Sequence, residues 1–286
     1  MSFQAAATRE PPSTDYASTQ EENEMSVTQS DKAEAFRALH REGCFIMPNP
    51  WDAGSARLLA GMGFAALATS SGAAAGVLGR RDGELTRDEA LAHARGIVMA
   101  TELPVAADLE NGFGDDPQAA ALTIQLAAEA GLVGGSIEDA GGVHDRRIYP
   151  LAQAVERVAA AAEAARALPF PFTLTARCEN FLRGQPDLDD TLRRLQAYER
   201  AGADVLFAPL LPDLAAVRTI CAELRKPVNF MVARKGLCFS VPELREAGVR
   251  RISLATSLYR AAMEGLRLAA DEVQRDGRFG FLDRLP

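Results

Sequence analysis

The sequence predicts an α/β protein in which eight strand–helix alternations close into a single (β/α)8 barrel. Three observations support this prediction. Eight short apolar runs recur along the 286 residues, amphipathic segments separate them, and several of those segments end in a glycine just before the next run. A chain of 286 residues is long enough for one barrel of about 250 residues with short extensions.

The apolar runs are short and nearly continuous, which is typical of strands buried on both faces of a parallel sheet. In order they are CFIM from Cys44, AALAT from Ala65, PVAAD from Pro104, GGSIED from Gly134, FTLTAR from Phe172, DVLFAP from Asp204, PVNFMV from Pro227 and RISLAT from Arg251. A doubly wound open sheet is the competing fold, but no Gly-x-Gly-x-x-Gly follows any run, which disfavours a dinucleotide-binding sheet.

The segments between the runs have helical patterns, for example DEALAHARGIVMA at residues 88–100 and LAQAVERVAAAAEAARAL at residues 151–168. Glycine follows four of them, at Gly63, Gly131, Gly202 and Gly248. Glycine closes a helix in the left-handed conformation without a Cβ penalty, so these positions predict a repeated turn from helix to strand.

The first residues have a different composition from the rest. Residues 1–30 are rich in Ser, Thr, Glu and Pro without a sustained hydrophobic period, which predicts a disordered N-terminal arm. Residues 31–286 form the predicted barrel catalytic domain with a C-terminal helical extension.

The composition excludes several classes of function. A net charge of -8 disfavours nucleic acid and anionic membranes as partners. No apolar stretch reaches the roughly 20 residues of a membrane span. The four cysteines are widely spaced, without a disulfide or zinc pattern, which indicates a reducing compartment and predicts a cytoplasmic protein.

Acidic residues follow neighbouring runs where a barrel has its mouth. Asp108 and Glu110 follow one run and Glu138 ends the next, while Asp82 lies in the preceding loop. Since Asp108 and Glu110 are two residues apart, we expect them to point to the same side of a continuing strand. Clustered carboxylates take up protons unless a cation lies between them, and oxygen ligands favour Mg2+ or Mn2+.

Acidic residues after strands are also ordinary helix caps. Asp115 and Asp116, in the sequence GDDP, are assigned to the start of the next helix. For Asp108, Glu110 and Glu138 together, the metal interpretation is preferred.

Arg177 lies in an apolar pattern, where an arginine needs an anionic partner. It either pairs with Glu179 or another acid at the mouth, or holds a substrate carboxylate in a bidentate manner, and the sequence leaves both open. Ser70, Ser71 and Gly72 either offer donors to an anionic ligand or form an ordinary turn.

His144 lies on the glycine-led loop GGVHDRRIYP after the fourth run. A histidine on a surface loop is usually without a role, but this loop overhangs the mouth of the predicted barrel. His144 is therefore a candidate proton donor.

Several motifs occur together and in order: NPWDAGSARLL, LGRRDGE, AADLENGFGD, GGSIEDA, HDRRIYPLA, TARCENFL and AYERAGADVLF. Through them the chain resembles the phosphoenolpyruvate mutase/isocitrate lyase superfamily over nearly all of residues 31–271. The resemblance implies a modified barrel whose last helix is exchanged between subunits, in a homo-oligomer that is a dimer or a tetramer.

The resemblance also implies a metal site. The superfamily segment D-A-D-T-G-[FY]-G reads DLENGFG in this chain. Asp108 would bind Mg2+ directly, Glu110 would replace the usual second aspartate, and Glu138 would act through bound water.

The same resemblance implies the contacts of the substrate. Asp82 matches an acid near the metal and substrate, and Arg177 matches an arginine that holds the substrate carboxylate. Contacts to substrate oxygens are implied for Ser70, Ser71 and Gly72. The implied chemistry is cleavage of a carbon–carbon or carbon–phosphorus bond next to a pyruvate-like enolate held on Mg2+.

Two differences from the superfamily motifs narrow the range of expected activities. Isocitrate and methylisocitrate lyases carry K-[KR]-C-G-H after the fourth strand, whereas this chain reads EDAGGVHDRRIYP without a cysteine. In phosphonate mutases the loop after the fourth strand is a longer gate over the site, with a lysine where this chain has Ala140. The chain is therefore placed in a subgroup with a short gate, distinct from both.

The sequence thus predicts a Mg2+-dependent carbon–carbon lyase that acts on a small 2-hydroxy or 2-oxo dicarboxylate and releases a 2-oxo acid. The proton donor is His144, Tyr149 or water, with His144 preferred, and Asn229 is expected at the substrate aperture with Pro209 and Thr256. The alternatives are a phosphonomutase or phosphonopyruvate hydrolase, and a non-catalytic barrel that binds a 2-oxo acid.

Overall fold

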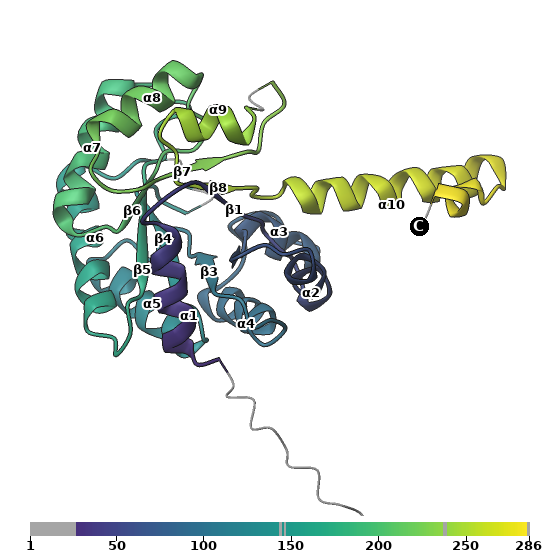
Figure 1. The fold of residues 1–286 in the computed structure, drawn as a ribbon, viewed down its shortest axis with the longest axis horizontal. Coiled ribbons are helices and arrows are strands. Elements are labelled where there is room, and N and C mark those ends of the chain that lie inside the picture. The colour runs from purple at the N-terminus through teal and green to yellow at the C-terminus, as the bar shows by residue number, and fades with distance from the viewer. Residues whose placement is uncertain (1–26, 143–144, 146, 237–238, 285–286) are drawn as a thin grey trace, which may run out of the picture.

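Eight parallel strands form one sheet that curls into a nearly closed barrel surrounded by helices (Figure 1). The computed structural model describes residues 27–142, 145, 147–236 and 239–284. The strands are β1 (Phe45–Met47), β2 (Leu67–Ala68), β3 (Val105–Asp108), β4 (Gly134–Glu138), β5 (Thr173–Arg177), β6 (Val205–Phe207), β7 (Val228–Met231) and β8 (Arg251–Ser253). Each predicted run contains one of them, so the predicted barrel is confirmed.

The sheet order is β1-β8-β7-β6-β5-β4-β3-β2. At the seam between its two ends, the amide of Ala68 donates a hydrogen bond of 3.1 Å to the carbonyl of Pro48. In the middle of the sheet, β4 and β5 pair over their full length, with Glu138 opposite Arg177. This register brings an acid and a base together at the carboxyl ends of two strands.

The helices are α1 (Gln29–Leu39), α2 (Ala53–Gly61), α3 (Ser71–Val77), α4 (Arg87–Val98), α5 (Pro117–Glu129), α6 (Leu151–Arg166), α7 (Leu188–Ala201), α8 (Leu214–Glu223), α9 (Val241–Glu246) and α10 (Ser257–Asp276), followed by a 3-10 helix, η1 (Gly280–Arg284). Capping boxes begin α1, α2, α4 and α9, at Thr28, Asp52, Thr86 and Ser240. These side chains satisfy amide groups that the first turn of a helix leaves unpaired.

The helix α1 covers the amino ends of the strands. Ala33 and Phe36 are completely buried in a cluster with Met47, Ala68 and Val133. The Gln29 amide donates to the carbonyls of Ala128 and Leu132, just before β4. Because α1 begins at Gln29, it includes the last residues of the predicted arm, while residues 1–26 lie outside the described residues.

A buried arginine lies inside the barrel, near α1. Arg251 donates to Asn229 Oδ1 at 2.8 Å and to Thr175 Oγ1 at 2.9 Å, and its Nη1 lies 3.3 Å from His40 Nε2. Burial lowers the pKa of Arg251 to about 9. Its neighbours in the barrel are neutral hydrogen-bonding groups.

The last helix, α10, projects away from the barrel (Figure 1). None of its residues is buried, and its exposed apolar side chains include Met263, Leu266 and Val273. These three positions lie on one face, at spacings of three and seven residues. The predicted C-terminal helical extension therefore presents an apolar stripe that its own barrel leaves uncovered. No helix in the described ranges is long and apolar enough to cross a membrane.

The four glycines that follow predicted helices all have positive φ, between 86° at Gly63 and 108° at Gly202. At Gly131 the φ is 92°, and an added Cβ would lie 2.7 Å from Val98 Cγ1. Both the backbone conformation and the space therefore exclude a larger residue.

We predict that Gly131→Ala lowers the free energy of unfolding by about 2 kcal/mol, because alanine resists this conformation and clashes with Val98. The measurement is urea unfolding followed by circular dichroism. Gly96→Ala is the matched control, since Gly96 is exposed inside α4 with open space around its Cα. It should raise stability by about 0.5–1 kcal/mol. Equal effects of the two substitutions would contradict the turn argument.

Candidate active site

Carboxylates and guanidinium groups gather at the carboxyl ends of β3, β4 and β5. We call this group the acid cluster, and its members are Asp82, Asp108, Glu110, Glu138, Glu179, Arg177 and Arg183. Most of them line a cavity of about 230 Å³, which also includes Ser71 and Asn111. Parallel strands end at the same edge of a barrel, so acids far apart in sequence meet at its mouth.

Arg177 lies at the centre of the acid cluster. Its Nη1 is 3.4 Å from Asp108 Oδ2 and 3.4 Å from Glu138 Oε2. Its Nε donates to Glu179 Oε1 at 2.5 Å. Of the two interpretations left open by the sequence, the structure shows the ion pairs, and it shows three of them.

The environment of Arg177 keeps it charged. Burial by itself would lower its pKa, but the carboxylates of Glu179, Glu138 and Asp108 raise it above its ordinary value. Its guanidinium carbon also lies 5.3 Å from the centre of the Phe207 ring, a cation–π distance. Arg177 is thus a permanent cation among acids.

A second arginine, Arg183, contacts the same acids from the loop after β5. Its Nη2 is 3.0 Å from Glu138 Oε1, and its Nε is 3.4 Å from Glu179 Oε2. Arg183 was not among the site residues predicted from the sequence. The sequence feature that could have identified Arg183 is its position in the loop after β5, the strand that ends at Arg177.

Negative charge exceeds positive charge in the acid cluster. Burial, followed by the carboxylates of Asp108 and Asp82, raises the pKa of Glu110 to about 8. Burial and then Glu179 raise the pKa of Glu138, and burial also raises the pKa of Asp82. The cluster holds five carboxylates and two guanidinium groups, so an additional cation would lower its electrostatic energy.

An all-oxygen donor set with excess negative charge fits a hard divalent cation such as Mg2+. Nevertheless, no group of three or more His, Cys, Asp or Glu residues in the described part of the chain is already arranged to hold a metal. The position of Arg177 Nη1 explains this arrangement, because the nitrogen lies near both Asp108 and Glu138 and pairs with the carboxylates that a metal would need.

The backbone places Glu110 differently from the sequence expectation. The strand β3 ends at Asp108, and Glu110 adopts a φ of 49°. Its amide donates to Asp108 Oδ1 at 3.2 Å. The strand therefore does not continue to Glu110, so strand alternation does not place Asp108 and Glu110 on one side as predicted, although Glu110 does line the cavity. Left-handed backbone at a residue other than glycine is costly and is often found at functional sites.

The segment from Ser70 to Gly72 lies beside these acids. Ser71 Oγ donates to Asp108 Oδ2 at 3.1 Å, and Ser71 also hydrogen-bonds to Asp82. A Cβ added to Gly72 would lie 3.2 Å from Asp82 Oδ2. Ser70 is buried at the start of α3 and makes no capping hydrogen bond with its side chain.

Asn229, which was expected at the substrate aperture, is buried inside the barrel. It is the second residue of β7, and its amide donates to Ser253 Oγ at 3.0 Å while its oxygen accepts from Arg251. It does not line the 230 Å³ cavity of the acid cluster, but it lines a smaller cavity of about 60 Å³ together with Ser70, Asp108 and Arg177. The structure therefore places Asn229 in the interior of the barrel, with its amide already bonded.

The candidate proton donors have different outcomes. His144 lies outside the described residues. Tyr149 is completely buried, and its hydroxyl donates to Asp115 Oδ1 at 2.6 Å and accepts from Asn111 at 3.0 Å. Burial and Asp115 raise the pKa of Tyr149 to about 12, so this phenol retains its proton.

The expected helix-capping role of Asp115 and Asp116 holds only in part. Asp116 occupies the N-cap position of α5 before Pro117, but its side chain makes no capping hydrogen bond. The Asp115 carboxylate instead accepts from Tyr149 and lies 3.6 Å from Arg147. Tyr149 can compete for this carboxylate because the loop after β4 folds against the loop after β3.

A buried network supports the acid cluster from behind. Asp139 accepts from the amide of Glu179 at 2.8 Å, from the Tyr198 hydroxyl at 2.5 Å and from Arg194 at 3.3 Å. These bonds fix the first residue after β4 to the loop after β5. They hold the backbone that carries Glu138 and Glu179.

A family model described as phosphoenolpyruvate phosphomutase matches residues 36–274. The chain belongs to this family.

Relatives of this family member carry names of lyases and mutases. A solved structure named only as a lyase/mutase, from Burkholderia cenocepacia J2315, is 54% identical with a TM-score of 0.88, covering 90% of this chain and 93% of the other. The 2-methylisocitrate lyase of Escherichia coli (strain K12) is 30% identical, covering 85% of this chain and 84% of the relative. The structure of a 2,3-dimethylmalate lyase is 26% identical with a TM-score of 0.79, covering 87% and 89%.

We predict that Arg177→Ala lowers the free energy of unfolding of this phosphoenolpyruvate phosphomutase family member by about 3–5 kcal/mol, because it leaves buried carboxylates without their cation. The measurement is urea unfolding at neutral pH. Arg193→Ala is the matched control, because Arg193 pairs with Asp190 on the surface, where ion pairs contribute about 0–1 kcal/mol. Equal losses in both variants would show that the cluster does not depend on Arg177.

Proposed function

We propose that this chain is a Mg2+-dependent lyase that cleaves a carbon–carbon bond of a small 2-hydroxy or 2-oxo dicarboxylate through a stabilised enolate and releases a 2-oxo acid. The observation that carries the proposal is the acid cluster, five carboxylates around Arg177 at the barrel mouth. Its cavity of about 230 Å³ suits a small molecule. The lyase names of two relatives support carbon–carbon cleavage.

The residues proposed to hold Mg2+, or alternatively Mn2+, are Asp108, Glu110 and Glu138. Carboxylate oxygens are suitable donors for either ion. The bound ion would supply electrostatic stabilisation of the negative charge that develops on the substrate oxygen.

The other proposed roles concern binding and orientation. Arg177 holds the carboxylate of the substrate, and Asp82 and Ser71 orient the substrate beside it. Ser70 and Gly72 are proposed to approach a substrate oxygen. His144 is proposed to donate the proton that the enolate carbon needs.

The substrate of the Escherichia coli relative is not assigned to this chain. The loop after β4 reads EDAGGVHDRRIYP and lacks the cysteine that the resemblance associates with methylisocitrate cleavage. The proposal therefore stays with small dicarboxylates as a class.

The test is a substrate screen in the presence of Mg2+, with malate, citramalate, alkylmalates, oxaloacetate and phosphonopyruvate. Formation of a 2-oxo acid from a dicarboxylate supports the lyase. Release of phosphate, or conversion of phosphonopyruvate to phosphoenolpyruvate, would instead support a phosphonopyruvate hydrolase or a phosphonomutase, in keeping with a relative of 36% identity named as a phosphonomutase. Oxalate binding without any turnover would support a non-catalytic binding barrel.

We predict that Asp108→Asn weakens Mg2+ binding at least tenfold, about 1.4 kcal/mol or more, because it removes the proposed direct ligand. Isothermal titration calorimetry with MgCl2 measures the change. Asp88→Asn in the first turn of α4 is the control and should bind Mg2+ like the natural chain. Unchanged affinity in Asp108→Asn would exclude the proposed metal site.

We also propose that α10 packs against a second copy of the chain in a dimer or tetramer. The support is its apolar stripe, in which Leu266 is 62% exposed. An isolated amphipathic helix of this length is stabilised mainly by burying such a stripe.

We predict that the double substitution Met263→Lys and Leu266→Lys dissociates the oligomer, because it places two charges on the stripe. Analytical ultracentrifugation measures the mass. The control is Glu264→Gln, which lies about 100° around α10 from Met263, about 160° from Leu266 and about 180° from Val273, and it should leave the mass unchanged. A monomeric natural chain, or an oligomer that survives the double substitution, would contradict the proposal.

A further inference from the structure

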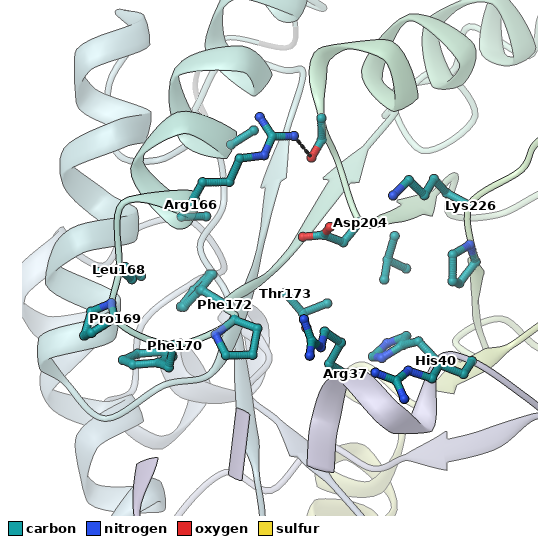
Figure 2. Close-up of a pocket in the computed structure, with 17 residues that line it drawn as sticks. Arg37, His40, Arg166, Leu168, Pro169, Phe170, Phe172, Thr173, Asp204 and Lys226 are labelled. Carbon is teal, nitrogen blue, oxygen red and sulfur yellow. Dashed lines mark hydrogen bonds between the residues drawn. The ribbon is translucent and has the colours of Figure 1, made fainter. Parts of the chain in front are cut away.

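A second cavity, larger than that of the acid cluster, lies at the opposite end of the barrel. It has a volume of about 610 Å³, and we call it the basic pocket (Figure 2). Its walls come from the end of α1, the end of α6 with the loop before β5, and the residues just before β6 and β7. Thr173 at the start of β5 lines the basic pocket, whereas Arg177 at the end of β5 belongs to the acid cluster. Four residue steps along a strand separate them by about 13 Å.

The lining of the basic pocket is strongly cationic. Arg37, Arg41, Arg166 and Lys226 line it together with a single carboxylate, Asp204. Arg37, Arg166 and Lys226 all act electrostatically on Asp204. Such a concentration of positive charge is unexpected on a chain with a net charge of -8.

These cations are poorly neutralised within the chain. Arg37 pairs with Glu34 at 2.6 Å on the exposed rim. Arg166 donates to the carbonyl of Gly202, and among the described residues no carboxylate forms an ion pair with Arg41, Arg166 or Lys226. Asp204 already accepts a hydrogen bond from the amide of Leu174. Cations gathered in a concave site repel one another, and a bound anion would remove this repulsion.

His40 does not add to the charge. Its Nδ1 contacts the carbonyl of Phe36 at 2.8 Å, and burial followed by the nearby Arg251 lowers its pKa to about 3. It is therefore a neutral part of the wall at physiological pH.

The opposite wall of the basic pocket is apolar. Leu168, Pro169 and Phe170 lie together on one side in Figure 2, away from Arg37 and Lys226. Pro171 and Phe172 continue this wall from the same loop. Flat, rigid proline and phenylalanine surfaces suit a ring, and a volume of about 610 Å³ is within the range of sites for small organic ligands.

We propose that the basic pocket binds a multiply charged organic anion with a planar ring, of the nucleoside phosphate class. The phosphates would contact Arg41, Arg166 and Lys226, for which arginine and lysine are the usual partners. The ring would lie against Pro169 and Phe170. This end of a barrel is not where catalytic residues gather, so the pocket is a binding site separate from the acid cluster.

The test is calorimetric titration of the full chain with ADP in EDTA, so that no divalent cation takes part. We expect ADP to bind, pyrophosphate to bind at least tenfold more weakly because it lacks the ring, and adenosine to bind at least tenfold more weakly because it lacks the charge. The double substitution Arg41→Ala and Lys226→Ala should weaken ADP binding at least tenfold. The control Arg57→Ala with Arg193→Ala removes the same charge from exposed positions outside the pocket and should bind ADP normally.

The proposal would be overturned by the absence of ADP binding, by equal losses in the two double variants, or by pyrophosphate binding as tightly as ADP. Asp108→Asn separates this proposal from the proposed lyase activity, because it alters the acid cluster at the other end of the barrel. ADP binding that survives Asp108→Asn but not the pocket substitutions supports the basic pocket whatever the outcome of the substrate screen. ADP binding lost in Asp108→Asn alone would assign the nucleotide to the acid cluster and overturn the proposal.

Discussion

The charge balance around Arg177 is the interaction on which the mouth of this barrel depends. Three carboxylates contact one guanidinium group, and they come from the last residues of β3 and β4 and from the loop after β5. Without the cation these acids would repel one another in a buried setting, where charge repulsion is only weakly screened. Arg177 therefore joins three neighbouring strand ends electrostatically, and the backbone bonds of Asp139 keep those ends in place.

Two buried arginines of the barrel, Arg177 and Arg251, have different partners and opposite pKa shifts. Arg251 lies near the amino ends of the strands among Asn229, Thr175 and His40, and burial lowers its pKa to about 9. Arg177 lies at the carboxyl ends among carboxylates, which raise its pKa. Neutral partners satisfy the hydrogen bonds of Arg251 without attracting further ions. Acidic partners in excess, as around Arg177, leave a site that favours an additional cation.

The fold could be predicted from the sequence because its signals are local and repeated. Each apolar run became a strand, and each predicted turn glycine has a positive φ. The position of a side chain along the barrel axis was not predictable, because it depends on the register of all eight strands. Asn229 shows this: its strand was predicted correctly, yet it lies among Arg251 and Ser253 in the interior.

The acid cluster could be predicted in part for the same reason. Asp108 and Glu138 end their strands, so their meeting follows from the parallel sheet. Arg183 comes from a loop, and its contact with Glu138 depends on how that loop folds back. The left-handed backbone of Glu110 was also not predictable, because an apolar strand pattern does not define the residue at which the strand ends.

The two interpretations of Arg177 need not compete. Its Nη1 contacts Asp108 and Glu138, which are the same carboxylates that are proposed to hold Mg2+. A cation held by those carboxylates would neutralise their negative charge and weaken their attraction for Arg177. The guanidinium group, still anchored through Nε to Glu179, could then turn its outer nitrogens toward a substrate carboxylate. On the proposed function, Arg177 pairs with Asp108 and Glu138 when the site is empty and with the substrate carboxylate when the site is filled. Glu179 is the partner that Arg177 keeps in both arrangements.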